Sequence, residues 1–262
     1  MKTLKLITAV YLGISALLLS SCDELGVGCI RGNGNITTEG RVVSDFSGVE
    51  VNGSFVVYVD SSNETSVLVE ADENLLDEIR TQVRGNNLVI DTHRDRCLNS
   101  RHDIIIYVTT PDIDELIMRG SGRINCSRFE TNNLNVDVSG SGRIYMDYFK
   151  TQDSNLGISG SGTVTGTIDA YSSDLRVDGS GKIMIDGNAH IVNLNITGSG
   201  NIRADEFYSD ICNVTITGSG DAYVYATDLL DARITGSGNV FYYGNPADVV
   251  KQITGSGNIV KR

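Results

Sequence analysis

The sequence contains no tryptophan and only two prolines in 262 residues, and aromatic residues make up 6% of it. With so little proline, no proline-rich linker divides the chain. Positive charge is also scarce: 21 Lys and Arg against 33 Asp and Glu give a net charge of −12, which argues against nucleic-acid binding because phosphates would be repelled. The apolar fraction of 40% is too high for a disordered chain. Abundant glycine, with short Val and Ile runs among Asn, Ser and Thr, predicts many strands, tight turns and little helix.

The N-terminus has the pattern of an export signal. Lys2 and Lys5 precede an apolar run over residues 6–19, which is too short to span a bilayer as a helix. The next residues, Leu19-Ser20-Ser21-Cys22, resemble the lipobox of bacterial lipoproteins. This resemblance implies cleavage before Cys22, lipid on its sulfur and amino group, and stable anchoring by several palmitate-like acyl chains. The alternative is an ordinary signal peptide in which the cysteine occurs by chance.

The triplet Gly-Ser-Gly recurs eight times at nearly even spacing. Its first glycines are Gly120, Gly140, Gly160, Gly179, Gly198, Gly218, Gly236 and Gly255, at intervals of 20, 20, 19, 19, 20, 18 and 19 residues. Periods of this length indicate stacked supersecondary units, either leucine-rich repeats or β-solenoid coils.

The residues around each triplet favour the solenoid. From Gly140 onward the position two before the first glycine holds Val or Ile, and the position four after it holds Ile, Val or Ala. Polar residues alternate with these columns, so the period is two and the segments are strands. We therefore predict a parallel β-helix with about one coil per 19–20 residues, in which the glycines form a corner that needs a positive φ or close backbone approach.

Residues 30–118 are less regular. Strand-like runs occur at 55–59, 66–70, 87–92 and 103–108, and Asp72 is a candidate N-cap for one short helix, ENLLDEIRTQV. We divide the chain into a signal peptide (1–21), an anchor segment and linker (22–39), irregular N-terminal β coils (40–118) and a regular GSG-repeat β-helix (119–262). The alternative for the irregular part is a separate small β-sandwich packed end-on.

Three segments carry a resemblance to a known family. The stretches DFSGVEVNGSFVVYV (Asp45–Val59) and VEADENLLDEIRTQVRGNNLVI (Val69–Ile90), followed by the GSG series, resemble the putative auto-transporter adhesin, head GIN domain family. The resemblance implies a right-handed β-helix in a secreted or lipid-anchored envelope protein. It supplies no catalytic residues.

The cysteines beyond Cys22 fall into two groups. Cys126 and Cys212 lie on inward columns about four coils apart, too far for a disulfide, so we expect both to be small buried residues. Cys29 and Cys97 lie in irregular segments and are candidates for a disulfide that would pin the start of the solenoid. His93, Cys97 and His102 match no established zinc spacing, and the neighbouring arginines would repel a cation. This basic segment is either a solvated loop or a contact for an anionic glycan or lipid headgroup.

Surface residues suggest binding more than catalysis. Tyr223 and Phe241 share one outward column on consecutive coils, and Tyr225 and Tyr243 share another. These four residues are the candidate ligand surface, because exposed aromatic rings stack on sugars or anchor proteins; the alternative is a ladder that stabilises the rod. Asp147, Asp186 and Asp205 share a column, but no His or Lys accompanies them, which disfavours a polysaccharide-cleaving enzyme.

The combined hypothesis is a non-enzymatic lipoprotein of the cell envelope, held in the outer membrane by lipid on Cys22 and facing the periplasm or the cell surface. It would act as a binding or adhesion module, without cofactor or metal, for a glycan or an envelope or host protein. Self-association end to end through the last coil is a further expected contact, with Lys261 and Arg262 limiting its growth. The alternatives are a polysaccharide-cleaving enzyme and a purely structural envelope element.

Overall fold

The computed structural model describes residues 28–262, so Cys22 and the predicted signal peptide lie outside the described residues. Twenty-three strands and two short 3-10 helices make up the secondary structure of this part. The elements are β1 (Ile30–Arg31), β2 (Ile36–Arg41), β3 (Gly48–Gly53), β4 (Val56–Ser61), β5 (Ser66–Asp72), η1 (Glu73–Glu78), β6 (Ile79–Arg84), β7 (Asn87–Thr92), η2 (His93–Asp95), β8 (Leu98–Asn99), β9 (Ile105–Thr110), β10 (Glu115–Gly120), β11 (Arg123–Glu130), β12 (Asn133–Gly140), β13 (Arg143–Lys150), β14 (Asp153–Gly160), β15 (Thr163–Gly179), β16 (Lys182–Gly198), β17 (Asn201–Ala204), β18 (Phe207–Gly218), β19 (Asp221–Tyr225), β20 (Leu229–Gly236), β21 (Asn239–Tyr243), β22 (Asp248–Gly255) and β23 (Asn258–Lys261).

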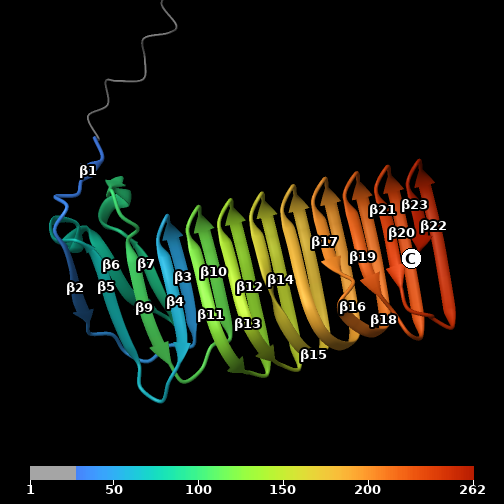
Figure 1. Ribbon diagram of the computed structural model, residues 1–262, viewed down its shortest axis with the longest axis horizontal. Helices are drawn as coiled ribbons and strands as arrows, with labels where there is room; N and C mark the ends of the chain where they lie inside the picture. The colour runs from blue at the N-terminus through green and yellow to red at the C-terminus, as the bar shows by residue number, and fades with distance from the viewer. Residues whose placement is uncertain (1–27) are drawn as a thin grey trace, which may run out of the picture.

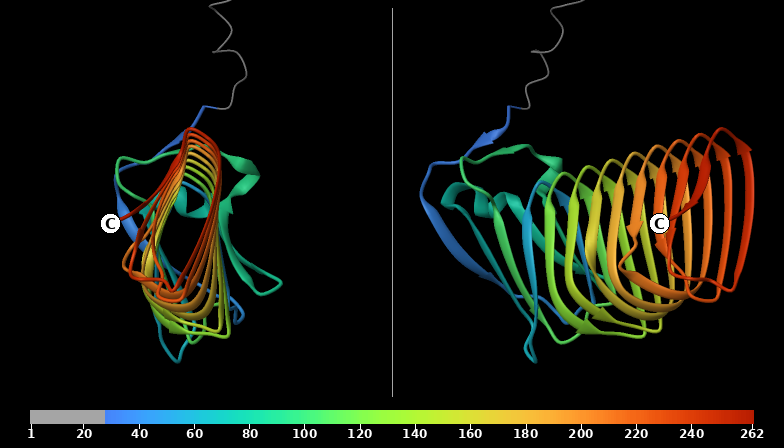
Figure 2. Two further views of the ribbon diagram at one scale, coloured as in Figure 1. Left: turned by 90° about the vertical axis from the view of Figure 1, so that its right-hand side faces the viewer. Right: turned by 45° about the vertical axis from the view of Figure 1, so that its right-hand side comes forward.

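The chain forms a β-solenoid, as predicted. Each regular coil rises along one face to a Gly-Ser-Gly corner, descends along the opposite face and bends back through a lower turn (Figure 1). Strands of successive coils pair in parallel, and the corner glycines keep strict register, Gly120 against Gly140 and Gly140 against Gly160. Viewed along the rod, the coils superpose in one flattened outline (Figure 2).

The corner explains the repeated triplet. Each first glycine has a φ between 114° and 130° in the eight triplets, a region that side chains rarely adopt. A Cβ on Gly140 would also lie 2.8 Å from the carbonyl oxygen of Gly120 in the coil before it. The serine amide of each corner donates to that same carbonyl, as Ser141 does to Gly120 at 3.0 Å. The prediction of a positive-φ, closely stacked corner is therefore confirmed.

The interior is a continuous column of aliphatic side chains. The positions two before and four after the first glycine are buried in every coil up to the triplet at Gly236, as Ile196 and Ile202 illustrate for one coil. Cys126 and Cys212 are free and buried, as expected, and burial raises the pKa of both thiols.

Differences in coil length are accommodated at the lower turn. The ladder between β13 and β15 shifts between Met146 and Phe149, while the corners on either side stay in register. Farther along, β15 and β16 each run uninterrupted round this turn for 17 residues. The lower turn is thus the part of the coil whose shape varies from one repeat to the next.

The N-terminal part extends both faces of the solenoid with mixed pairing. β3 and β4 form a coil parallel to β10 and β11, and β7 and β9 pair in parallel with the other edges of β3 and β4. Beyond them, β6 is antiparallel to β7, and β5 is antiparallel to both β9 and β2. The sheet is continuous through this region, and the antiparallel strands close the first end of the core, a feature that the sequence did not indicate.

The helix that the sequence predicts after Asp72 is shorter in the structure than expected. Only Glu73–Glu78 is helical, as a 3-10 segment, and the remaining residues of the predicted helix form β6. The Asp72 side chain makes no capping bond; it accepts hydrogen bonds from the Gly34 amide, at 2.6 Å, and from the Ser100 hydroxyl. Antiparallel pairing with β7 outweighs the weak local helix propensity.

Cys29 and Cys97 are joined by a disulfide that ties the start of the described chain to the connection between β7 and β9. The two-residue strands β1 and β8 pair in parallel beside it. Within residues 28–262, no helix has the length and apolarity needed to cross a membrane.

The last described coil leaves the inner side chains of β22 exposed. Ile253 is 45% exposed, whereas Ile234, which holds the same position one coil earlier, is 2% exposed. Lys251 occupies an inward column; its ammonium lies 4.9 Å from the Tyr242 ring and donates to the Ile259 carbonyl at 3.3 Å. A charged side chain therefore lies over the end of the core. End-to-end association stays a prediction.

Candidate functional site

Two of the predicted surface aromatics stack on each other. The rings of Tyr223 on β19 and Phe241 on β21 lie 4.9 Å apart with an interplanar angle of 26°. Arg203 covers the outer face of the Tyr223 ring at 5.1 Å, and Arg262 covers that of Phe241 at 4.9 Å. Since both faces of each ring are occupied, this column has the geometry of a stabilising ladder rather than of an open stacking platform.

Tyr225 and Tyr243 are register partners at the lower ends of β19 and β21, and both are half-buried. The Tyr225 ring packs edge-on against Tyr208, with centroids 4.7 Å apart at 76°. Tyr208 comes from β18, one coil earlier. Of the four predicted residues, Tyr225 is thus the one whose ring packs against Tyr208, which lines the hollow described next.

A hollow of about 350 Å³ lies on this turn, over four consecutive coils. Its floor is made of small side chains that the ladder places in register: Ala170 of β15, Ala189 of β16 and Ser209 of β18. Larger residues flank this column, so the small ones leave a depression. The hollow exists because the continuous strands carry their register round the bend.

Two tyrosines and a histidine flank the hollow. Tyr208 lines it and is 50% exposed; Tyr171, just beyond the floor residue of β15, is 56% exposed. The Tyr171 ring lies 5.1 Å from the His190 ring at a tilt of 37°. These tyrosines are among the most exposed aromatic side chains of the rod, in contrast to the covered rings of the predicted ladder.

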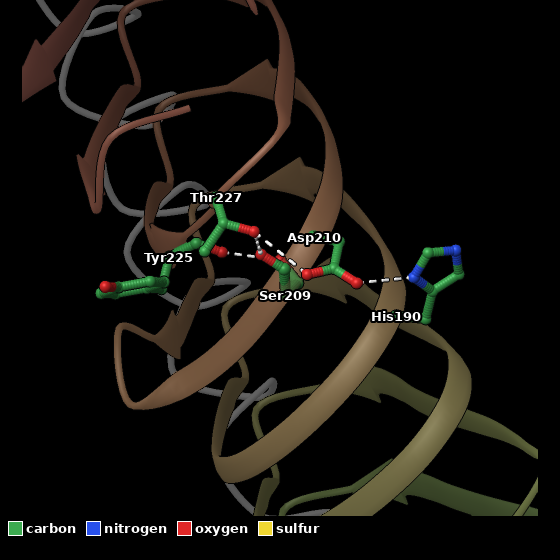
Figure 3. Close-up of polar contacts among 5 residues, drawn as sticks. All are labelled: His190, Ser209, Asp210, Tyr225 and Thr227. Carbon is green, nitrogen blue, oxygen red and sulfur yellow. Dashed lines mark hydrogen bonds and ion pairs between the residues drawn. The ribbon is translucent and has the colours of Figure 1, made fainter. Parts of the chain in front are cut away.

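A hydrogen-bond network joins the polar residues of the hollow (Figure 3). His190 Nδ1 donates to Asp210 Oδ2 at 2.7 Å, and the Thr227 hydroxyl donates to Asp210 Oδ1 at 3.0 Å. The bond from His190 and then that from Thr227 hold the pKa of the Asp210 carboxyl below its ordinary value. The carboxylate orients the Nδ1–H of the ring, and Nε2 lies on the far side of the ring from Asp210 (Figure 3).

The hollow contains Ser, His and Asp but not a hydrolytic triad. The Ser209 hydroxyl is 3% exposed and donates to the Tyr225 carbonyl at 2.6 Å, so its hydrogen bond goes to the backbone and not to the histidine. A nucleophile must reach its base and the substrate, and this serine does neither. The arrangement suits recognition of hydroxyl groups.

The other sequence candidates are engaged elsewhere. Cys97 is in the disulfide and so offers no thiolate to join His93 and His102 around a metal. Within residues 28–262, no group of three His, Cys, Asp or Glu side chains is arranged to hold a metal ion. Of the carboxylate column, Asp147 accepts from Arg128 at 3.1 Å and Asp205 lies 3.9 Å from Arg203.

A protein-family model matches this chain in two overlapping segments. The model of the family described as putative auto-transporter adhesin, head GIN domain, matches residues 45–153 and again 147–246. The chain belongs to this family. The two matches together span the N-terminal coils and most of the regular repeat. No curated protein matches the chain.

Solved structures share the fold over nearly the whole described chain. A putative lipid binding protein from Parabacteroides distasonis is 29% identical, with a TM-score of 0.83, and the alignment covers 90% of this chain and 100% of that one. A putative adhesin from Parabacteroides merdae is 23% identical, with a TM-score of 0.85 and coverage of 89% and 98%. A putative adhesin from the same P. distasonis strain is 24% identical, with a TM-score of 0.84 and coverage of 90% and 100%.

Tyr171, His190, Tyr208 and Asp210 were not among the residues predicted from the sequence. The sequence feature that could have revealed them is the column of small residues at 170, 189 and 209, each followed by a larger aromatic or polar residue. An offset counted from the corner glycines does not predict the position of these residues, because the coils differ in length at the lower turn.

Proposed function

We propose that this chain is a non-enzymatic binding module of the bacterial cell envelope, anchored in the outer membrane by lipid on Cys22, whose ligand is a glycan held at the hollow of the lower turn. Membership of an adhesin-like family and the adhesin names of its structural relatives support the coarse part of this proposal, a binding protein of the envelope. The lipobox-like Leu19–Cys22 supports the anchor.

The observation that carries the ligand class is the hollow itself. Tyr208 in the lining and Tyr171, which packs against His190, supply exposed rings for a pyranose, and His190, Asp210 and Asn188 supply polar groups. The chain carries a net charge of −12, so a neutral sugar fits better than an acidic one. An envelope or host protein that uses the same tyrosines as anchors is the competing ligand.

A glycan array with the lipid-free chain tests the ligand class, followed by titration of the best sugar against two variants. Tyr208→Ala and Tyr171→Ala each remove one ring, and each loss should weaken binding up to about tenfold. Tyr145→Ala is the matched control, because Tyr145 is 49% exposed on a strand face away from the hollow. Equal binding by all three variants would place the ligand elsewhere, and an array without hits together with capture of a protein would favour the protein ligand.

The anchor is tested separately. Metabolic labelling with palmitate should mark the wild-type chain and not a Cys22→Ala variant, and the variant should leave the membrane fraction. Protease treatment of intact cells then distinguishes the cell surface from the periplasmic face. A labelled Cys22→Ala chain would refute the lipobox assignment.

A further inference from the structure

The connection between β7 and β9 departs furthest from the solenoid pattern. In a regular coil the two faces join through the short Gly-Ser-Gly corner, whereas here residues 93–104 make the same crossing. We call residues 93–102 the disulfide loop. The Cys29–Cys97 bond and the pairing of β1 with β8 hold it at the end of the rod where the described chain begins (Figure 1).

The disulfide loop is a basic island on an acidic protein. Its sequence, HRDRCLNSRH, has three arginines and one aspartate, and the whole chain has a net charge of −12. Arg94, Arg96 and Arg101 are exposed, and so is Arg31, which β1 places against Asn99 of the loop. Every one of these cations is an arginine, the residue whose planar guanidinium binds phosphate oxygens in pairs.

An apolar hollow of about 400 Å³ lies between the disulfide loop and the first corner of the solenoid. Phe55, Leu98 and Ile104 supply apolar lining, and Arg96 and Cys97 belong to the same wall. Arg96 also lies 3.4 Å from Glu78, an ion pair at the surface that contributes little to stability. A guanidinium beside apolar surface matches a ligand with an anionic head and a hydrocarbon tail.

We propose that the disulfide loop binds phosphate headgroups of an anionic bilayer, with Arg31, Arg94, Arg96 and Arg101 on the phosphates and the hollow against the first methylenes of an acyl chain. Its nearness to the bilayer rests on the proposed lipid on Cys22. Seven residue steps separate Cys22 from Cys29, so an extended chain allows at most about 25 Å between them. The loop therefore sets how the anchored rod stands on the membrane.

The positive charge of the loop alone would fit any polyanion, whereas the apolar hollow beside it favours a lipid. A polysaccharide or polyphosphate offers phosphates or carboxylates without hydrocarbon, and would leave the apolar hollow beside the half-buried Leu98 and Ile104 without an apolar partner. A bilayer supplies both parts at once. The attraction between the arginines and an anionic bilayer should weaken with added salt, because salt at about 0.1 M screens charges that are more than roughly 10 Å apart.

The test uses the mature chain with Cys22→Ser, which takes no lipid, so that its outcome does not depend on the anchor. Vesicles of phosphatidylcholine with one-third phosphatidylglycerol should co-sediment with this protein at low salt, and vesicles of phosphatidylcholine alone should not. Each arginine near an anionic surface strengthens partitioning about fivefold, so Arg94→Gln/Arg96→Gln/Arg101→Gln should weaken it roughly a hundredfold.

The control variant Arg123→Gln/Arg143→Gln/Arg176→Gln removes the same charge from the regular coils and should bind vesicles as the parent does. Thermal melts confirm that both triple variants are folded. Equal loss in the two variants would show attraction by overall charge, and competition by polyphosphate that is as strong as binding to the vesicles would show an anion surface without lipid preference. Either result would overturn the proposal, while glycan binding at the distant lower turn would stand unaffected.

Discussion

The corner glycines make a sharp stability prediction at Gly140. Its φ is 114°, and a β-carbon there would lie 2.8 Å from the carbonyl oxygen of Gly120. An alanine costs about 1–2 kcal/mol for the left-handed backbone. Relief of the clash costs about 1–3 kcal/mol more, because the Gly120 carbonyl belongs to the backbone of the preceding coil, which is held in place by its own stacking. The total, about 3 kcal/mol, lowers the melting temperature by about 6–12 °C in a chain of this size.

Two other glycines calibrate the measurement. Gly157 lies within β14 with an ordinary φ, and the nearest atom to its added β-carbon would be 3.5 Å away, so Gly157→Ala should stabilise the chain by about 0.5–1 kcal/mol. Gly142, at the third corner position, would meet the flexible Met118 side chain, and its alanine variant should fall between the other two. Circular dichroism melts of the three variants give the order. Equal melting of Gly140→Ala and Gly157→Ala would refute the stacked-corner explanation.

Three further predictions address the ends of the rod and the site. Replacing Cys29 and Cys97 with serine should lower the free energy of unfolding by up to about 4 kcal/mol in urea titrations, since the bond spans 68 residues; an unchanged midpoint would mean that the bond does not constrain the unfolded chain. Lys251→Leu removes the inward charge at the last coil and should produce dimers in sedimentation at high concentration, where the parent chain shows fewer; equal behaviour would dismiss a blocking role. The hydrogen bonds from His190 and Thr227 lower the pKa of the Asp210 carboxyl, so their contribution to fold stability is present above the ordinary carboxyl pKa and is lost as pH falls through the lowered one. The variant His190→Ala should return the Asp210 pKa toward its ordinary value in an NMR titration. An unaltered titration would contradict the contact.

The regular coils were predictable because each constraint repeats. A corner that only glycine can form, such as that at Gly198, recurs with β-branched residues at fixed offsets, so circumference, strand direction and core columns follow from one alignment. Parity on the strand faces is equally fixed by the period of two. It placed Cys126 and Cys212 inward and Tyr223 outward, where they are found.

The N-terminal end could not be predicted in the same way. Its strands β2, β5 and β6 pair antiparallel, and nothing in an alternating apolar pattern distinguishes parallel from antiparallel partners. The segment after Asp72 has helix-like spacing over only eleven residues, and pairing of β6 against β7 takes up its second half. Pairing across the sheet, not local propensity, decides this region.

The candidate site was missed because parity does not carry past the lower turn. A one-residue shift such as that between Met146 and Phe149 reverses which side chains point outward, so an offset counted from the corner loses its meaning there. The same freedom explains why a site belongs there. The corners are fixed by glycine and the strand faces by their ladders, whereas the lower turn can change length and side chains without unstacking the rod. In a protein built from one repeated coil, a hollow such as that beside His190 can form where the repeat is least strict.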